Sequence, residues 1–231
     1  MKYCLTILLI TILSCDTSVN QKQDMKQINY KAGIIDTNNI SVAVFVHDNV
    51  EILDLAAPIE IFDRAGMNVF TVGASNGLVK SQGVLDVKPE FTIDNCPNAD
   101  IVVFVGGNGA KAAKNTLVTK WIQKIAPETP QFFTVCTGAF FLAEAGLLKN
   151  KSVTTFHDSI SMLKEFDSSI NVISSTRFVD DGQIISTAGV SAGIDGALYL
   201  VEKLMGKERV EKVIKYMEYP YWDKSKGTII E

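Results

Sequence analysis

Cys136 is the side chain in this sequence best placed to act as a nucleophile. It follows the apolar, strand-like run 131–135 and precedes small residues at 137–139, which lead into a helical pattern. A strand, a sharp turn and a helix in this order are typical of a nucleophile elbow. Unpaired N–H groups and the helix dipole lower the pKa of a thiol at such a helix start, which favours the reactive thiolate. The alternative is a buried cysteine that acts as a small apolar side chain.

The elements that would hold Cys136 in place alternate between strand and helix. Near-continuous apolar, β-branched runs are typical of strands buried on both faces, and apolar residues three or four positions apart are typical of helices. Strands are expected at 40–46, 68–72, 84–93, 101–105, 131–135, 152–155 and in a hairpin around 181–182, and helices at 53–65, around Trp121, up to Gly146, and at 159–166, 191–205 and 207–217. This alternation predicts an α/β sandwich with a mostly parallel sheet.

Four segments that directly follow predicted strands carry reactive or polar side chains. They are residues 47–54, 106–109, 136–138 and 156–158. In an α/β sheet of this kind, ligands bind beyond the carboxyl ends of the strands. We therefore expect the four segments to converge on one site around the cysteine.

The first 39 residues differ in composition from the rest of the chain. Residues 1–15 combine one lysine, an apolar run too short to span a bilayer and the sequence Ile-Leu-Ser-Cys ending at Cys15, which predicts a bacterial signal peptide with a lipobox. Residues 16–39 are polar and predict a flexible tether. We expect an exported lipoprotein, periplasmic or at the cell surface, whose lipidated Cys15 anchors the domain 40–231 to a membrane. An ordinary secretory signal or an uncleaved anchor is the alternative.

Composition excludes several classes of partner and cofactor. The formal net charge is −4 with no basic block, so nucleic acid is not expected as a partner. Apart from the first 15 residues, the cysteines are Cys96 and Cys136, which excludes a disulfide framework. Two histidines without paired cysteines predict no metal site. No cofactor is expected, since Gly106-Gly107 is not continued as a phosphate-binding loop.

Four short motifs together resemble the ThiJ/PfpI superfamily, whose members are class I glutamine amidotransferase-like. They are LDLAAP at 53–58, VGG at 105–107, VCTGA at 135–139 and TAGVSAGID at 187–195. The similarity is greatest to the branch that contains isonitrile hydratase and domains of some transcription regulators. It implies a flavodoxin-like three-layer sandwich and commonly a homodimer. The regulators of this branch carry a C-terminal helix-turn-helix, a pattern that does not follow Trp222, so a regulator is not expected.

The resemblance also implies a role for each residue of the site. Cys136 would be the nucleophile, and Asp54 would carry a proton, as an acid toward the substrate and as a carboxylate that activates water. Gly107 and Thr137 would offer backbone N–H groups as an oxyanion hole, to which Thr137 would add its hydroxyl. The structural alternatives are a helix N-cap for Asp54 and a plain turn for Gly107.

The two histidines are candidates for a partner of the cysteine. In family members with a Cys-His pair, the histidine directly follows two threonines, whereas here Phe156 follows Thr155 and His157 comes one position later. A one-residue offset in an extended segment turns a side chain to the opposite face, so a helix N-terminal position is the alternative for His157. His47 could reach the site from the first loop, although we expect it to be a solvated loop residue.

Hydration of a small substrate is the leading functional expectation. The resemblance implies a lyase, hydratase or hydrolase in which the Cys136 thiolate adds to an isonitrile carbon, and water then releases a formamide from the thioimidate. Glyoxalase-type or deglycase-type activity on reactive dicarbonyls is the alternative enzyme, although its usual Cys, His and Glu set is incomplete here. A non-catalytic ligand-binding or redox-sensing domain, in which Cys136 is oxidised, is the alternative from another class.

Overall fold

The computed structural model describes residues 35–231, and eight strands of this part of the chain form one sheet. From one edge to the other they are β12 (Thr228–Ile229), β10 (Phe178–Asp181), β11 (Ile184–Thr187), β7 (Gln131–Val135), β6 (Ile101–Phe104), β1 (Ser41–Val46), β2 (Asn68–Gly73) and β5 (Phe91–Thr92). Neighbouring strands are parallel except β10 and β11, which form an antiparallel hairpin. The mostly parallel sheet predicted from the sequence is confirmed.

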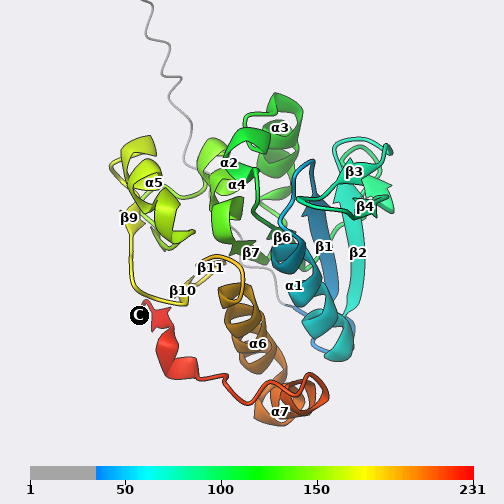
Figure 1. Cartoon of the computed structure of the whole chain (residues 1–231), viewed down its shortest axis with the longest axis vertical. Helices are drawn as coiled ribbons and strands as arrows, with labels where there is room; N and C mark the ends of the chain where they lie inside the picture. Colours follow the sequence, from blue (N-terminus) through cyan, green and yellow to red (C-terminus); the bar gives the residue numbers. More distant parts are fainter. Residues whose placement is uncertain (1–34) are drawn as a thin grey trace, which may run out of the picture.

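Helices cover both faces of this sheet and complete three layers (Figure 1). One face carries α1 (Ile52–Arg64), α6 (Ala192–Met205) and α7 (Lys207–Tyr216). The other face carries α2 (Gly109–Ala112), α3 (Thr116–Ile125), α4 (Ala139–Glu144) and α5 (Ile160–Phe166). The chain is therefore the flavodoxin-like α/β sandwich that was expected.

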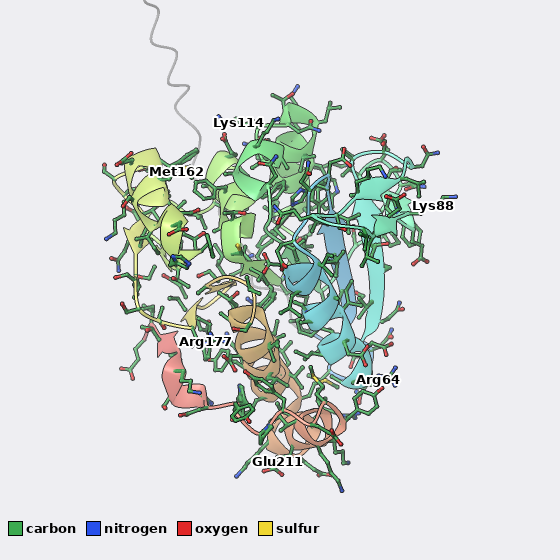
Figure 2. The ribbon with its side chains drawn as sticks, viewed as in Figure 1. Arg64, Lys88, Lys114, Met162, Arg177 and Glu211 are labelled. Carbon is green, nitrogen blue, oxygen red and sulfur yellow. The ribbon has the colours of Figure 1, made fainter. Side chains whose placement is uncertain are left out.

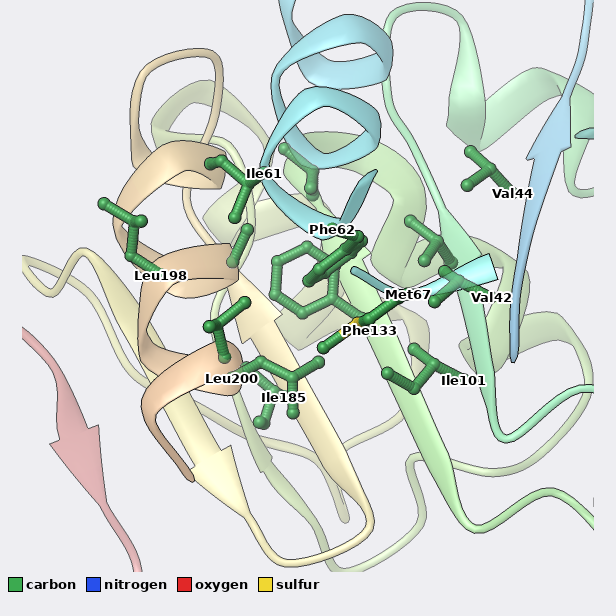
Figure 3. Packing of buried hydrophobic residues seen from close by; sticks show 14 of the residues in the cluster. Val42, Val44, Ile61, Phe62, Met67, Ile101, Phe133, Ile185, Leu198 and Leu200 are labelled. Carbon is green, nitrogen blue, oxygen red and sulfur yellow. The ribbon is translucent and has the colours of Figure 1, made fainter. Parts of the chain in front are cut away.

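Two apolar cores lie between the sheet and its helices. Val42 and Val44 of β1 belong to the core beneath α1 and α6, whereas Ala43 and Phe45 belong to the core on the other face. In the first core, Phe62 of α1 meets Phe133 of β7 nearly edge-on, with ring centroids 5.7 Å apart (Figure 3). Because each strand is covered on both faces, its sequence is a continuous apolar run instead of an alternating one.

The strand order places a ligand crevice at one point of the sheet. The five central strands lie in the order β2, β1, β6, β7, β11, so the chain adds β2 on one side of β1 and then β6, β7 and β11 on the other. This is the flavodoxin-like order, in which ligands bind where the order reverses, beyond the carboxyl ends of the strands. The loops that follow β1 and β6 meet at this point, and the elbow after β7 lies next to them.

Some short elements differ from the expected ones. The predicted extended segment 84–93 forms two short strands: β4 (Asp86–Val87), which pairs with β3 (Val79–Lys80) in a separate hairpin, and the edge strand β5. β8 (Ser152–Val153) pairs with β9 (Asn171–Val172) outside the main sheet. Single turns of 3₁₀ helix lie at η1 (Cys136–Gly138), η2 (His157–Ser159) and η3 (Lys224–Lys226).

The predicted signal peptide, Cys15 and most of the predicted tether lie outside the described residues. The remainder of the tether, 35–39, forms a turn in which the Asn39 N–H donates to the Asp36 carbonyl over 3.1 Å. Among residues 35–231, no helix is long and apolar enough to cross a membrane.

Candidate active site

Cys136 lies on a sharp turn between β7 and η1. Its φ of 58° is in the left-handed region, which is uncommon for a residue other than glycine and occurs mainly at functional sites. The turn is held from two sides: the Cys136 N–H donates to the Ala188 carbonyl over 3.2 Å, and the Thr155 hydroxyl donates to the Cys136 carbonyl over 2.7 Å. The backbone is that of a nucleophile elbow, with the side chain only 6% exposed.

Two glycines after β6 allow the site to close tightly around the thiol. A methyl group added at Gly106 would lie 2.6 Å from both Asp54 Oδ2 and Cys136 Cβ, and 2.8 Å from Cys136 Sγ. Gly107 has a φ of +92°, and an added methyl group there would overlap the Asn49 carbonyl oxygen. Gly106 must therefore lack a side chain because there is no space for one. Gly107 must lack one for the same reason and also because of its backbone conformation.

Asp54 is fully buried and points toward the thiol. Its Oδ1 accepts from the Val190 N–H over 2.8 Å, and its Oδ2 accepts from the Gly106 N–H over 3.2 Å. The N-cap of α1 is Glu51, whose carboxylate accepts from the Asp54 N–H over 2.7 Å. The alternative role of Asp54 as a helix N-cap is thus wrong, and its carboxyl group faces the site instead.

The turn that follows β11 supplies the second donor to Asp54. Val190 has a φ of 55°, a strained value for a β-branched residue, and this conformation carries its N–H to the carboxyl group. Arg177, labelled in Figure 2, supports the turn. Its Nη2 donates to Ser191 Oγ over 3.1 Å, and its Nε pairs with the buried Asp195 over 2.6 Å. Tyr219 also donates to Asp195, so the C-terminal segment helps to fix this turn.

The electrostatics of the pair favour the neutral form of the Cys136 thiol. Burial, followed by the negative charge of Asp54, raises the pKa of the Cys136 thiol to about 12. Burial, followed by the charge of Glu51, raises the pKa of Asp54 to about 7. The N–H groups of Thr137 and Gly107 donate toward the sulfur and oppose the rise in thiol pKa, but they are outweighed. The lowered thiol pKa expected from the helix start is therefore wrong for the resting protein.

The backbone N–H groups of Gly107 and Thr137 both donate toward the Cys136 sulfur. The structure thus brings the two residues predicted to form an oxyanion hole to the nucleophile. The Thr137 hydroxyl donates to the Gly107 carbonyl over 3.2 Å, so its proton is already engaged.

His157 points away from the cysteine. Its side chain is 76% exposed and its Nδ1 pairs with Asp158 Oδ1 over 2.8 Å. Phe156 takes the inner position: an added methyl group at Gly189 would overlap the Phe156 ring and lie 3.3 Å from Cys136 Sγ. The one-residue offset seen in the sequence thus places a phenyl ring, not an imidazole, beside the nucleophile.

His47 is 7% exposed, so the expected solvated position is wrong. Its ring packs against Phe45 and Phe141, and its nitrogens lie 3.1 Å from the Val105 carbonyl oxygen and 3.0 Å from that of Asp48. Burial lowers the pKa of His47 below its ordinary value. The imidazole contacts the strand end that leads into the glycine pair, and it supports this loop from the opposite side of the sheet.

Other candidate groups lie outside this site. Within residues 35–231, no three His, Cys, Asp or Glu side chains are grouped so that they could hold a metal ion. Cys96 and Cys136 are both free thiols. Cys96 lines a small cavity together with Trp121 and Glu128, on the face of the sheet covered by α3.

Sequence reasoning missed four residues that shape the site. Glu51 had a signal, since an acidic residue three positions before Asp54 at a helix start is a capping pattern. Phe156 was noticed only because it follows Thr155 at the position where the resemblance predicts a histidine. Val190 and Thr155 had no local signal, because a left-handed valine and a threonine bonded to a carbonyl 19 positions away both depend on contacts between distant segments.

Comparison with known proteins agrees with this geometry. The family model for the DJ-1/PfpI family matches residues 40–203. Isonitrile hydratase of Pseudomonas putida is 30% identical over 185 residues, which cover 78% of each chain. Protein dj-1beta of Drosophila melanogaster is 25% identical over 186 residues, covering 78% of this chain and 98% of that protein.

Solved structures show the same fold. A ThiJ/PfpI family protein from Pseudomonas syringae superposes with a TM-score of 0.74 at 25% identity, covering 90% of this chain and 84% of that one. Drosophila melanogaster DJ-1beta superposes with a TM-score of 0.73 at 23% identity, covering 79% of this chain and all of that one. With the elbow cysteine and the sheet order described above, these matches show that the chain belongs to the DJ-1/PfpI family.

Proposed function

We propose that this protein is a cysteine-dependent hydratase that converts a small isonitrile into an N-substituted formamide. The observation that carries the proposal is the contact between the buried Cys136 thiol and Asp54, a carboxyl group whose pKa is raised to about 7. Such a group can both accept and return a proton near neutral pH. The similarity to isonitrile hydratase of Pseudomonas putida supports the same reaction.

The reaction begins from the neutral thiol. As Cys136 Sγ forms a bond to the terminal carbon of the isonitrile, the thiol proton passes to Asp54 and from there to the same carbon. The product is a thioimidate, R–N=CH–S–Cys. Water then adds across the C=N bond, with its oxygen bonding to carbon and one of its protons passing to nitrogen. The C–S bond breaks as the carbonyl forms, and the remaining hydroxyl proton returns to the sulfur as R–NH–CHO leaves. Asp54 carries the proton in each half of the cycle, so one carboxyl group serves as base and acid.

The surroundings of the pair suit this sequence of steps. Because burial raises the pKa of the thiol, the proposed reaction starts from the neutral thiol, and the sulfur gives up its proton as it bonds to the substrate. The N–H groups of Gly107 and Thr137 then stabilise the negative charge that develops around the sulfur. No imidazole is needed, which agrees with the outward position of His157.

The alternatives fit these contacts less well. Dicarbonyl chemistry of the glyoxalase or deglycase type relies on a Cys, His and Glu set, whereas Phe156 and Asp54 stand beside Cys136 here. A redox sensor requires a thiolate that peroxide can oxidise, and the raised thiol pKa opposes its formation.

The test is turnover of benzyl isocyanide by the purified protein, with the formamide product detected by mass spectrometry. Cys136→Ala is expected to abolish turnover, and Asp54→Asn to lower it by roughly 10²–10⁴-fold, the usual range for loss of a general acid–base group. Asp158→Asn, an exposed carboxylate, is the matched control. Cys136-dependent loss of methylglyoxal, or reversible peroxide modification without any turnover, would instead establish one of the alternatives.

We also propose that the protein is a lipoprotein anchored through Cys15. In a bacterial host that lipidates exported proteins, labelled fatty acid is expected to be incorporated into the wild type and not into Cys15→Ala. Export without labelling would contradict the anchor.

We further propose a homodimer. Large apolar side chains are exposed on neighbouring segments. Leu53 lies in the first turn of α1, and Leu85 lies in the β3–β4 hairpin, which Val50 joins through its bridge to Ser81. Leu85→Asp is expected to shift the sedimentation of the protein toward the monomer. A wild type that sediments as a monomer at micromolar concentration would contradict this assembly.

A further inference from the structure

We propose that Phe156 is a specificity-determining residue, whose ring forms an apolar wall beside Cys136 and selects electrophiles with a neutral, apolar substituent over charged ones. This inference rests on the proposed function for its substrate class, a neutral isonitrile. It concerns the side of the site that faces α6 and the turn after β11.

The backbone that carries Phe156 is fixed to the nucleophile turn. The Thr155 hydroxyl donates to the Cys136 carbonyl over 2.7 Å, and the Thr154 N–H donates to Ser186 Oγ over 2.9 Å. Both bonds are buried, so the segment after β8 cannot shift independently of the elbow. The adjacent side chain, Phe156, therefore has a defined position relative to the sulfur.

The contacts of a side chain placed at Gly189 show that the Phe156 ring lies near the Cys136 sulfur. A methyl group added at Gly189 would overlap Cδ2 of Phe156, lie 3.2 Å from its Cε2 and lie 3.3 Å from Cys136 Sγ. The ring edge and the sulfur thus border the same small space at Gly189. Phe156 is only partly buried and packs against the core cluster that includes Cys136. One part of the ring is anchored in the core, and the rest is free to contact a group bonded to the sulfur.

The charges near this wall oppose an anionic substrate. Asp54 contacts the Cys136 thiol, and Glu51 lies close enough to raise the pKa of Asp54. Basic groups of the adjoining segments are already engaged: Arg177 pairs with Asp195, and the exposed His157 pairs with Asp158. A carboxylate on the substrate would therefore meet negative charge and a phenyl ring without a cation to compensate its lost hydration.

The test compares two isonitriles that differ in the group next to the reacting carbon. The measured quantity is the ratio of kcat/KM for benzyl isocyanide to kcat/KM for isocyanoacetate. Phe156→Ala is expected to lower this ratio at least tenfold, since loss of an apolar contact in a binding site changes discrimination by about 10–200-fold. Phe156→Leu, which keeps an apolar side chain and preserves the packing, is expected to retain most of the ratio.

The controls separate selectivity from damage to the fold. General damage lowers kcat/KM for both substrates and leaves their ratio unchanged, so a ratio unaltered in both Phe156 variants would overturn the proposal. His157→Ala, which removes the exposed neighbouring ring, is the matched control and is expected to keep the wild-type ratio. If Phe156→Ala fails to fold, Phe156→Asn, which replaces the wall by a polar group, takes its place and is expected to lower the ratio in the same direction.

A second readout does not depend on hydration. The alkylation rate of Cys136 by N-benzyl iodoacetamide is compared with its rate by iodoacetate, using mass spectrometry of the intact protein. One outcome is that the wild type hydrates no isonitrile, while Phe156→Ala loses the wild-type preference for the benzyl reagent. This outcome would contradict the proposed reaction and support the apolar wall. Hydration with unchanged preference in both assays would support the reaction and refute the wall.

Discussion

Replacing Asp54 by asparagine tests whether a buried, partly protonated carboxyl group lies at the centre of the site. Burial raises the pKa of Asp54 from 3.8 to about 7. Because the folded-state pKa is raised, the group contributes its full stability below about pH 4 and loses it as the pH rises through 7. About three pKa units at about 1.4 kcal/mol each amount to roughly 4 kcal/mol, most of it lost between pH 4 and pH 8.

Asparagine has nearly the same shape but does not titrate in this range. Its Oδ1 can accept from Val190 N–H, whereas its amide N–H groups face the donor of Gly106, which costs about 1–3 kcal/mol at every pH. The variant is expected to be less stable than the wild type below about pH 4, where Asp54 is protonated in both the folded and the unfolded state. Above this pH the difference in unfolding free energy is expected to move in favour of the variant by about 1.4 kcal/mol per pH unit, to change sign before pH 7 and to level off above pH 8.

Urea unfolding at half-unit steps from pH 5 to pH 8.5 measures this difference. Glu51→Gln keeps the helix cap and removes the negative charge beside Asp54, so the pKa of Asp54 should fall. The loss of stability with rising pH should therefore end at a lower pH in this variant than in the wild type. Asp63→Asn, on the exposed surface of the same helix, is the control for an acid-to-amide change. A difference between wild type and Asp54→Asn that stays constant with pH would refute the assignment of a raised pKa to this carboxyl group.

Three further substitutions test the contacts that hold the site. Thr155→Val removes the donor to the buried Cys136 carbonyl and should lower the unfolding free energy by about 1–3 kcal/mol in urea, whereas Thr155→Ser should not. Gly106→Ala places a methyl group 2.6 Å from Cys136 Cβ, so we expect a lower Tm and loss of hydration, and wild-type values for both would contradict the close packing. Arg177→Met leaves the buried Asp195 without its cation and should cost about 3–5 kcal/mol by urea unfolding, with a smaller loss for Arg177→Lys.

The architecture was predictable because it depends on local patterns. A strand covered on both faces must be apolar throughout, and β7 begins and ends at the residues predicted, Gln131 and Val135. Helix α1 was predicted within one residue at either end, since its apolar spacing is that of a helix packed on one face. The extended segment before β6 was predicted less well, because strands of two residues have too few side chains to form a pattern.

Part of the site was also predictable. A small-residue turn between a strand and a helix identifies Cys136 from neighbouring residues alone, since the elbow is a local structure. The placement of Asp54 against the thiol depends instead on how α1 packs over the sheet, and sequence could reach it only through the family resemblance. The same limit explains why His47 was expected in solvent: its burial arises from rings on β1 and α4.

The sequence by itself determined the alternation of strands and helices and the elbow at Cys136. Only the tertiary structure decided the protonation of the site and the donors that surround it. A pKa depends on desolvation and on charges brought together from segments up to 136 residues apart, such as Val190 and Asp54. Local sequence reports the intrinsic preferences of a segment, whereas burial and charge at one point are properties of the whole packed chain.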